Sequence, residues 1–232
     1  MIYITGDVHG DPRRILDFCA KNELTAGDVI VILGDVAANY DLGPRDEWMK
    51  RSLSAVAPTL LCIHGNHEAR PQTVPGYKKK QWNGGVVYFQ PQYPNLLFAK
   101  DGEIYSLEGQ RCIAIGGAYS VDKHIRQARG WAWFQDEQPS EEIKAYVEQQ
   151  LEENQIDIVF SHTCPYRYEP IECFLPGVNQ SGVDDSTERW LDELEQRIDY
   201  SAWYCGHWHT DKRIDRMHFL FEKFEKILAI SK

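Results

Sequence analysis

The chain begins MIYITGDVHG (residues 1–10), an apolar run followed directly by a glycine-rich turn that carries Asp7 and His9. Residues 1–5 have the length and the β-branched and aromatic content of a strand. Glycines on both sides of the polar residues permit a sharp turn and a close approach of the backbone to a ligand. Because α/β sheets bind ligands beyond the carboxyl ends of their strands, this stretch predicts an α/β fold with a site at residues 6–10.

Four further polar clusters follow apolar runs of strand length in the same way. They are Gly34-Asp35 after residues 29–33, Gly65-Asn66-His67-Glu68 after residues 60–63, Ser161-His162 after residues 158–160, and Gly206-His207-Trp208-His209 after residues 202–205. The five clusters together hold five of the eight histidines. We therefore expect them to lie at carboxyl ends of strands, around one ligand crevice.

The polar side chains of these clusters are of the kinds that bind divalent metal ions. Asp, His and Asn supply oxygen and imidazole nitrogen without thiolate, a donor set that suits Mn, Fe or Zn. Asp7 or Asp35 alone would more often be a turn or helix cap, but the shared context favours metal binding. Two ions need about eight ligand positions including a bridge. The candidate ligands are Asp7, His9, Asp35, Asn66, His162, His207 and His209.

The rest of the chain predicts an α/β or α+β fold with two sheets flanked by helices, in a single domain over residues 1–232. Further strands are expected at residues 86–89, 96–99 and 112–115. Helix starts are expected at Asp11-Pro12, at Pro44, at Ser140, and at Asp185 with Glu188 as a capping box. Residues 217–230 fit either a strand or a helix. No linker or repeat suggests a second domain.

The composition of the chain limits the kinds of partner that we expect it to bind. A net charge of −10 argues against broad attraction to nucleic acid, although a local basic groove would still be compatible with it. No apolar run reaches membrane-spanning length and no export-signal pattern is present, so we expect a cytoplasmic protein with no membrane partner. The six cysteines form no CxxC pair and are predicted to be buried free thiols. Nothing in the sequence indicates the oligomeric state.

The motifs GDVHG, GD, GNHE, SH and GHWH, in that order over residues 6–209, resemble the signature of the calcineurin-like metallophosphoesterase superfamily. The resemblance implies a two-sheet β-sandwich flanked by helices. It implies that Asp7, His9, Asp35 and His209 hold one metal ion, and that Asp35, Asn66, His162 and His207 hold the other, with Asp35 as the bridge. It also implies that His67 protonates the leaving group or steadies the transition-state charge.

This site predicts hydrolysis of a phosphate ester by a hydroxide that bridges two metal ions. GDVHG and GNHE resemble the protein Ser/Thr phosphatase branch, although its Asp-Arg-Gly is replaced here by residues 35–37, Asp-Val-Ala. We expect a phosphomonoester substrate, either a phosphoprotein or a small phosphorylated metabolite. The alternatives are a phosphodiesterase or nuclease acting on nucleotides or RNA, and a non-catalytic binding scaffold.

Candidates for binding the substrate lie outside the five clusters. Asn39, Arg70, His124 and Arg126 could each contact phosphate. His124 and Arg126 belong to the long connection 116–139, which together with 163–184 has the length of a functional rim, or of ordinary exposed loops. The remaining features are expected to have structural roles. We expect His64 to be a packed support, His218 to be structural or exposed, and residues 78–80, Lys-Lys-Lys, to form a solvated loop.

Overall fold

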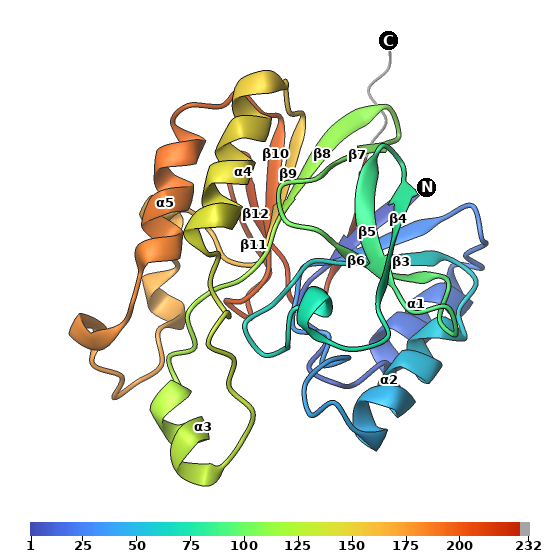
Figure 1. Ribbon diagram of the computed structural model, residues 1–232. Helices are drawn as coiled ribbons and strands as arrows, with labels where there is room; N and C mark the ends of the chain where they lie inside the picture. The colour runs from blue at the N-terminus through green and yellow to red at the C-terminus, as the bar shows by residue number, and fades with distance from the viewer. Residues whose placement is uncertain (228–232) are drawn as a thin grey trace.

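The computed structural model describes residues 1–227 and consists of two β-sheets packed face to face between two pairs of helices (Figure 1). No helix in this part of the chain is long and apolar enough to cross a membrane. The two-sheet sandwich flanked by helices confirms the fold class expected from the sequence.

The first sheet has seven strands in the order β13-β1-β2-β3-β6-β5-β4. Strands β1, β2, β3 and β6 run parallel, and β13, β5 and β4 run antiparallel to their neighbours. The bounds are β1 Ile2–Thr5, β2 Val29–Ile32, β3 Thr59–Cys62, β4 Lys78–Trp82, β5 Gly85–Phe89, β6 Leu96–Ala99 and β13 Phe224–Lys226.

The second sheet has six strands in the order β11-β12-β10-β9-β8-β7. Strands β8, β9, β10 and β12 run parallel, and β7 and β11 pair antiparallel at the two edges. The bounds are β7 Ile104–Leu107, β8 Gln110–Ile115, β9 Ile158–Ser161, β10 Ala202–Cys205, β11 Lys212–Ile214 and β12 Met217–Phe219.

The inner faces of both sheets form one apolar core, which includes Ile4 and Val31 from the first sheet and Phe160 from the second. Four strands consist entirely of buried residues, namely β2, β6, β9 and β12. Such continuous burial is expected where a sheet is covered on both faces. All six cysteines lie in the described part of the chain, are unpaired, and with the exception of Cys173 are buried, as predicted.

The helices cover the outer faces and begin close to the expected residues. Helices α1 (Arg13–Lys21) and α2 (Pro44–Ser54) cover the first sheet through Ile15 and Met49. Helices α4 (Glu141–Glu153) and α5 (Ser186–Glu195) cover the second sheet through Val147 and Leu191. The Oγ of the α4 N-cap residue, Ser140, accepts a hydrogen bond from Ile143 N at 3.3 Å, which confirms that cap.

Three sequence expectations differ from the structure. Residues 78–80 form part of the edge strand β4 rather than a loop. The capping box at Asp185 is not made, because the Asp185 carboxylate pairs with Arg189 at 2.7 Å. The connection 116–139 contains a short helix, α3 (Lys123–Arg129), which projects away from the sheets (Figure 1). Residues 217–226 contain two strands, and 228–230 lie outside the described residues.

Candidate metal centre

The five polar clusters meet because the parallel strands that carry them end level with one another. Thr5, Ile32 and Cys62 are aligned across the first sheet. Ser161 and Cys205 are aligned across the second. Loops leaving these five strand ends therefore start from one edge of the sandwich, and two contacts between a backbone group and a side chain join the sheets there. The His207 amide donates to Asp7 Oδ1 at 2.9 Å, and the His162 ring Nδ1 lies 2.7 Å from the Leu33 carbonyl.

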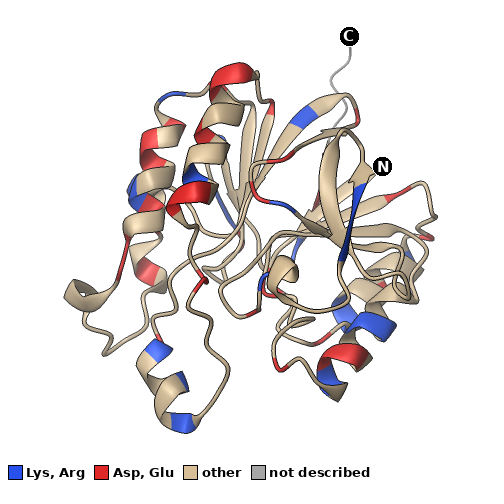
Figure 2. Ribbon diagram, viewed as in Figure 1, with Lys and Arg blue, Asp and Glu red and all other residues tan. Residues whose placement is uncertain are grey.

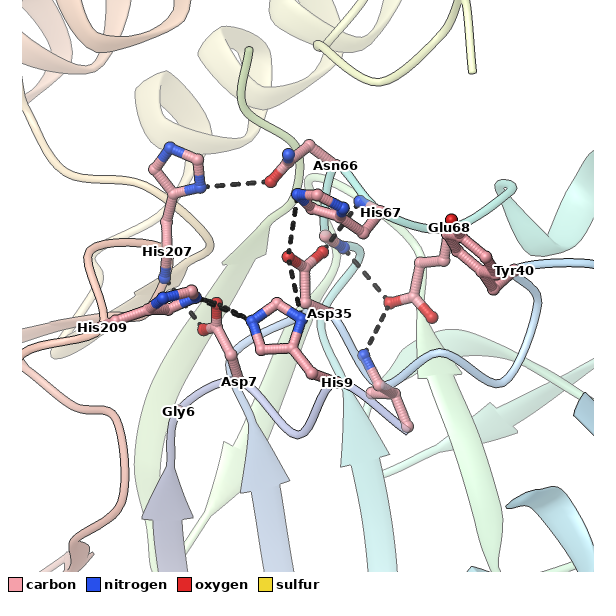
Figure 3. Close-up of polar contacts among 12 residues, drawn as sticks. Gly6, Asp7, His9, Asp35, Tyr40, Asn66, His67, Glu68, His207 and His209 are labelled. Atoms are coloured by element: carbon pink, nitrogen blue, oxygen red, sulfur yellow. Dashed lines mark hydrogen bonds and ion pairs between the residues drawn. The ribbon is translucent and has the colours of Figure 1, made fainter. Parts of the chain in front are cut away.

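One group of candidate ligands consists of Asp7, His9 and His209. The Nε2 atoms of the two histidines are 2.7 Å apart, and His209 Nε2 lies 3.2 Å from Asp7 Oδ2 (Figure 3). Asp7 Oδ2 is buried and makes no hydrogen bond within residues 1–227. A buried carboxylate oxygen without a hydrogen bond, beside two imidazole nitrogens, leaves lone pairs directed at a common point.

A second group consists of Asn66, His162 and His207. Asn66 Oδ1 lies 2.8 Å from His162 Nε2 and 3.1 Å from His207 Nδ1. The Asn66 amide nitrogen donates to Ser120 Oγ at 2.9 Å, which turns the amide oxygen toward the two imidazoles. Oxygen and nitrogen ligands thus converge here as they do in the first group.

Asp35 lies between the two groups (Figure 3). Its Oδ1 is 3.7 Å from His162 Nε2, whereas its Oδ2 is 4.0 Å from His9 Nδ1. A side chain at position 65 would collide with Asp35 Oδ1 and with the Asp35 backbone, so the glycine of GNHE is required by this close approach. One carboxylate therefore presents an oxygen to each group, as a bridging ligand must.

The backbone is unusual at four candidate ligands. His9 has φ 50°, Asp35 φ 48°, His207 φ 63° and His209 φ 49°. Left-handed conformations are uncommon for non-glycine residues and persist where the surrounding structure enforces them. In the loop after β10 they direct His207 and His209 to different groups, although the two residues are only two positions apart.

The electrostatics keep two of the candidate ligands, Asp7 and His207, in metal-binding protonation states. Burial raises the pKa of Asp7, but His209, His9 and His162 outweigh burial and hold that pKa well below its usual value. Burial, assisted by repulsion from His162, lowers the pKa of His207 to about 3. Asp7 is therefore a carboxylate and His207 a neutral imidazole at neutral pH, the forms that bind metal.

These observations fit two divalent ions, one in each group, with Asp35 shared between them. The donor set contains carboxylate, amide and imidazole ligands and no thiolate, which is compatible with several first-row metals. Among residues 1–227, the sets of carboxylate and histidine atoms close enough to hold an ion are Asp7, His9 and His209, and Asp7, Asp35 and His162. Asp7 belongs to both sets.

His67 lies beside this centre without belonging to either group. Its amide donates to Asp35 Oδ1 at 2.9 Å, while its ring Nε2 is 3.9 Å from Asp35 Oδ2 and 3.4 Å from Arg126 Nη2. Burial, with repulsion from Arg126 and His9, lowers the pKa of His67 despite the opposing pull of Asp35. Arg126 is held by Asp122, whose carboxylate oxygens are both 2.8 Å from Arg126 Nε.

Glu68 is a site residue that the sequence reasoning did not single out. It is 1% exposed, and its Oε1 accepts hydrogen bonds from the amides of Gly65 and Val36, at 3.3 and 3.4 Å. Burial and the nearby Asp35 raise the pKa of Glu68 to about 8. Glu68 therefore links the loops after β2 and β3. Its position as the last residue of the GNHE motif is the sequence feature that could have identified it.

Of the four candidate substrate-binding residues, only Arg126 reaches the cleft beside His67. Arg70 is buried in an ion pair with Asp101 and donates from Nε to the Asp136 carbonyl at 2.8 Å. Asn39 is fully buried and accepts a hydrogen bond from the Tyr77 hydroxyl at 2.8 Å. His124 is exposed on α3 and does not line the cleft.

His64 and His218 have the structural roles that the sequence predicted for them. His64 is buried with neither ring nitrogen hydrogen-bonded within residues 1–227, which makes it a packed support. His218 is buried and its Nδ1 lies 2.7 Å from Glu225 Oε2.

A cavity of about 750 Å³ opens beside the metal-ligand groups and is bounded by both long connections. The connection 116–139 supplies Tyr119, Val121, Asp122 and Arg126. The connection 163–184, with the start of α5, supplies most of the rest, including Glu169, Phe174 and Glu188. Lys and Arg residues occur along α3, in contrast to the acidic outer helices α4 and α5 (Figure 2).

The fold and the site define a metal-dependent hydrolase of phosphate esters. A family model of calcineurin-like phosphoesterases matches residues 1–211, and the chain belongs to that family. This membership confirms the resemblance noted in the motifs. No curated protein sequence is similar enough to count as a match.

Solved structures are similar to this chain at low sequence identity. Phosphopantetheinyl hydrolase from Mycobacterium tuberculosis is 13% identical, with a TM-score of 0.55 over 95% of this chain and 87% of that one, and has the same fold. Protein TT1561 of Thermus thermophilus is 14% identical, with a TM-score of 0.47 over 88% of this chain and 80% of that one.

Proposed function

We propose that the protein hydrolyses phosphate monoesters at a centre of two divalent ions, of Mn, Fe or Zn. Asp7, His9, Asp35 and His209 hold one ion, and Asp35, Asn66, His162 and His207 hold the other. When bound, such ions neutralise phosphoryl oxygens and lower the pKa of water, which supplies a nucleophile at neutral pH.

The single observation that favours a monoester is the position of Arg126. Its Nη2 lies 3.4 Å from His67 Nε2, at the mouth of the metal centre. A monoester phosphate carries up to two negative charges near neutral pH, whereas a diester carries one, so an added guanidinium favours the monoester. The Asp122 carboxylate fixes the arginine in place through Nε and leaves Nη2 directed at His67.

His67 is positioned to act on the leaving group. Its side chain is 21% exposed, and it lines the cavity rather than either ligand group. In this role His67 in its imidazolium form donates a proton to the departing alkoxide and is left as neutral imidazole, the form that its lowered pKa favours. Asp35 and Arg126 orient the ring. Glu68 contributes by holding together the loops that carry Asp35 and Asn66.

The test compares p-nitrophenyl phosphate with bis-p-nitrophenyl phosphate, using protein stripped of metal and then supplied with Mn²⁺. Metal-dependent turnover that favours the monoester is the expected result. A preference for the diester would replace this proposal with a phosphodiesterase or nuclease. Absence of turnover for both, in protein shown to bind the metal, would contradict catalysis and favour a binding scaffold.

A further inference from the structure

The cavity continues away from the metal ligands along a wall of apolar side chains, here called the distal wall. Trp208, which lies between the ligands His207 and His209 in the sequence, stacks on Phe174 with ring centres 5.8 Å apart and planes inclined by 21°. The wall therefore begins next to the phosphate position. Its other apolar members are Tyr119, Val121, Tyr166, Leu175, Val178 and Val183.

The distal wall also carries three carboxylates, from Glu169, Asp185 and Glu188. Asp185 is neutralised by Arg189, at 2.7 Å. Glu169 and Glu188 form no ion pair with any Lys, Arg or His among residues 1–227, and Glu188 is only 4% exposed. Burial raises the pKa of each of these two glutamates to about 7, and neighbouring carboxylates add to the increase. Arg189 opposes it at Glu169, and a hydrogen bond with Thr163 opposes it at Glu188.

Among the described residues that line the cavity, positive charge lies only at the other end. The lining residues include one arginine, Arg126, which faces His67, and no lysine within residues 1–227. Arg189 does not line the cavity, but its guanidinium lies over the Tyr166 ring of the distal wall, with Cζ 4.0 Å from the ring centre.

A substrate that placed a second phosphate or a carboxylate on the distal wall would meet Glu169 and Glu188, and Arg189, which attracts Glu169, is already paired with Asp185. Like charges in a partly buried site repel strongly. A cation placed there would instead gain charge-assisted hydrogen bonds.

We propose that the distal wall binds the leaving alcohol of the substrate, and that this alcohol joins an apolar or aromatic segment to a protonated amine. The inference rests on the proposed monoester hydrolysis and names its substrate class. Trp208, Phe174 and Leu175 contact the apolar segment, and Glu169 and Glu188 receive the amine. Nucleotides and other esters with several phosphates are poor substrates on this basis.

The test measures binding rather than turnover. Three non-hydrolysable phosphonates share one benzyl group and differ in the para substituent: hydrogen, aminomethyl or carboxymethyl. Their affinities for the Mn²⁺-loaded protein are compared by calorimetry at about pH 8, where a carboxyl group with a pKa near 7 is ionised. We expect the aminomethyl compound to bind at least about tenfold more tightly than the carboxymethyl compound.

Two matched pairs of variants locate the effect. The double change Glu169→Gln and Glu188→Gln should bring the affinity ratio close to one, while Glu172→Gln, an exposed glutamate outside the cavity that pairs with Lys212, should leave it unchanged. Leu175→Ser should weaken binding of the unsubstituted benzylphosphonate, while Ile171→Ser should not, because Ile171 is also exposed but does not line the cavity.

Equal affinities for the charged compounds, a preference for the carboxymethyl compound, or no binding of any phosphonate would overturn the inference. These results are separable from failure of the proposed function. Amine preference in a protein that does not hydrolyse p-nitrophenyl phosphate would support the distal wall and contradict the enzyme. Hydrolysis without amine preference would do the reverse.

Discussion

His9 Nε2 lies 2.7 Å from His209 Nε2, although 200 positions separate the two residues in the chain. Two imidazoles in this arrangement can share one proton or direct two lone pairs at one cation. Asp7 Oδ2, 3.2 Å from His209 Nε2 and without a hydrogen bond in residues 1–227, adds a third donor and favours the cation. The contact joins the loop after β1 to the loop after β10, so a metal ion bound here would also tie the two sheets together.

We therefore predict that His209→Ala removes one ion and leaves the other. The second group, built on Asn66, His162 and His207, does not use this side chain. Metal analysis after dialysis should give about one ion per chain instead of two. His124→Ala, a change of an exposed histidine outside the cavity, is the control and should keep both ions. Retention of two ions in His209→Ala would remove His209 from the ligand set.

His67→Ala should keep both ions and reduce kcat by about 10²- to 10⁴-fold, the usual contribution of a general acid. The loss should be larger for phenyl phosphate than for p-nitrophenyl phosphate, because the more basic phenoxide depends more on proton donation. A comparison of kcat for the two esters in wild type and variant measures this difference. An equal loss for both esters would mean that His67 acts on the phosphoryl charge instead.

Arg70 and Arg126 should respond differently to replacement by alanine. Arg70 is buried with Asp101, so Arg70→Ala leaves an uncompensated carboxylate and should cost about 3–5 kcal/mol of unfolding free energy. Arg126→Ala should raise KM, since its guanidinium faces the cleft, and should cost less stability than Arg70→Ala, because its partner Asp122 is 31% exposed. Urea denaturation and steady-state kinetics on both variants check this. A raised KM in a stably folded Arg70→Ala protein would return Arg70 to the phosphate site.

Glu188 should make the protein less stable as the pH rises. Its pKa in the folded protein is about 7, raised chiefly by burial above the usual 4.5, so the folded state binds more protons than the unfolded state between these values. Stability is therefore lost as the pH increases through this range, on the order of 3 kcal/mol in total. The difference in Tm between Glu188→Gln and wild type should favour the variant more at about pH 8 than at about pH 5. A difference independent of pH would contradict the raised pKa.

The convergence of the candidate metal ligands was predictable from sequence because each follows a short apolar strand, and parallel strands with aligned ends bring such positions together. The same local reasoning located the α4 cap at Ser140, which needs only a serine and the amide of Ile143. Both features depend on contacts over a few residues or on a repeated pattern.

Other features depend on partners that sequence patterns do not reveal. Residues 78–80 form an edge strand because β5 provides a template, and an edge tolerates lysine where a central strand would not. Arg70 follows the GNHE motif but turns to Asp101, 31 positions away. Helix α3 spans only seven residues, too few to show a repeating apolar stripe. The distal wall likewise combines Trp208 with residues of two irregular segments.

Asp35, the proposed shared ligand, offers the most direct test of the proposed dinuclear centre. Metal content and Mn²⁺-dependent hydrolysis of p-nitrophenyl phosphate should be measured for Asp35→Asn beside Asp17→Asn, an exposed aspartate on α1. We predict that Asp35→Asn loses both ions and nearly all turnover, while Asp17→Asn keeps two ions and full activity. Two ions and undiminished turnover in Asp35→Asn would contradict the account.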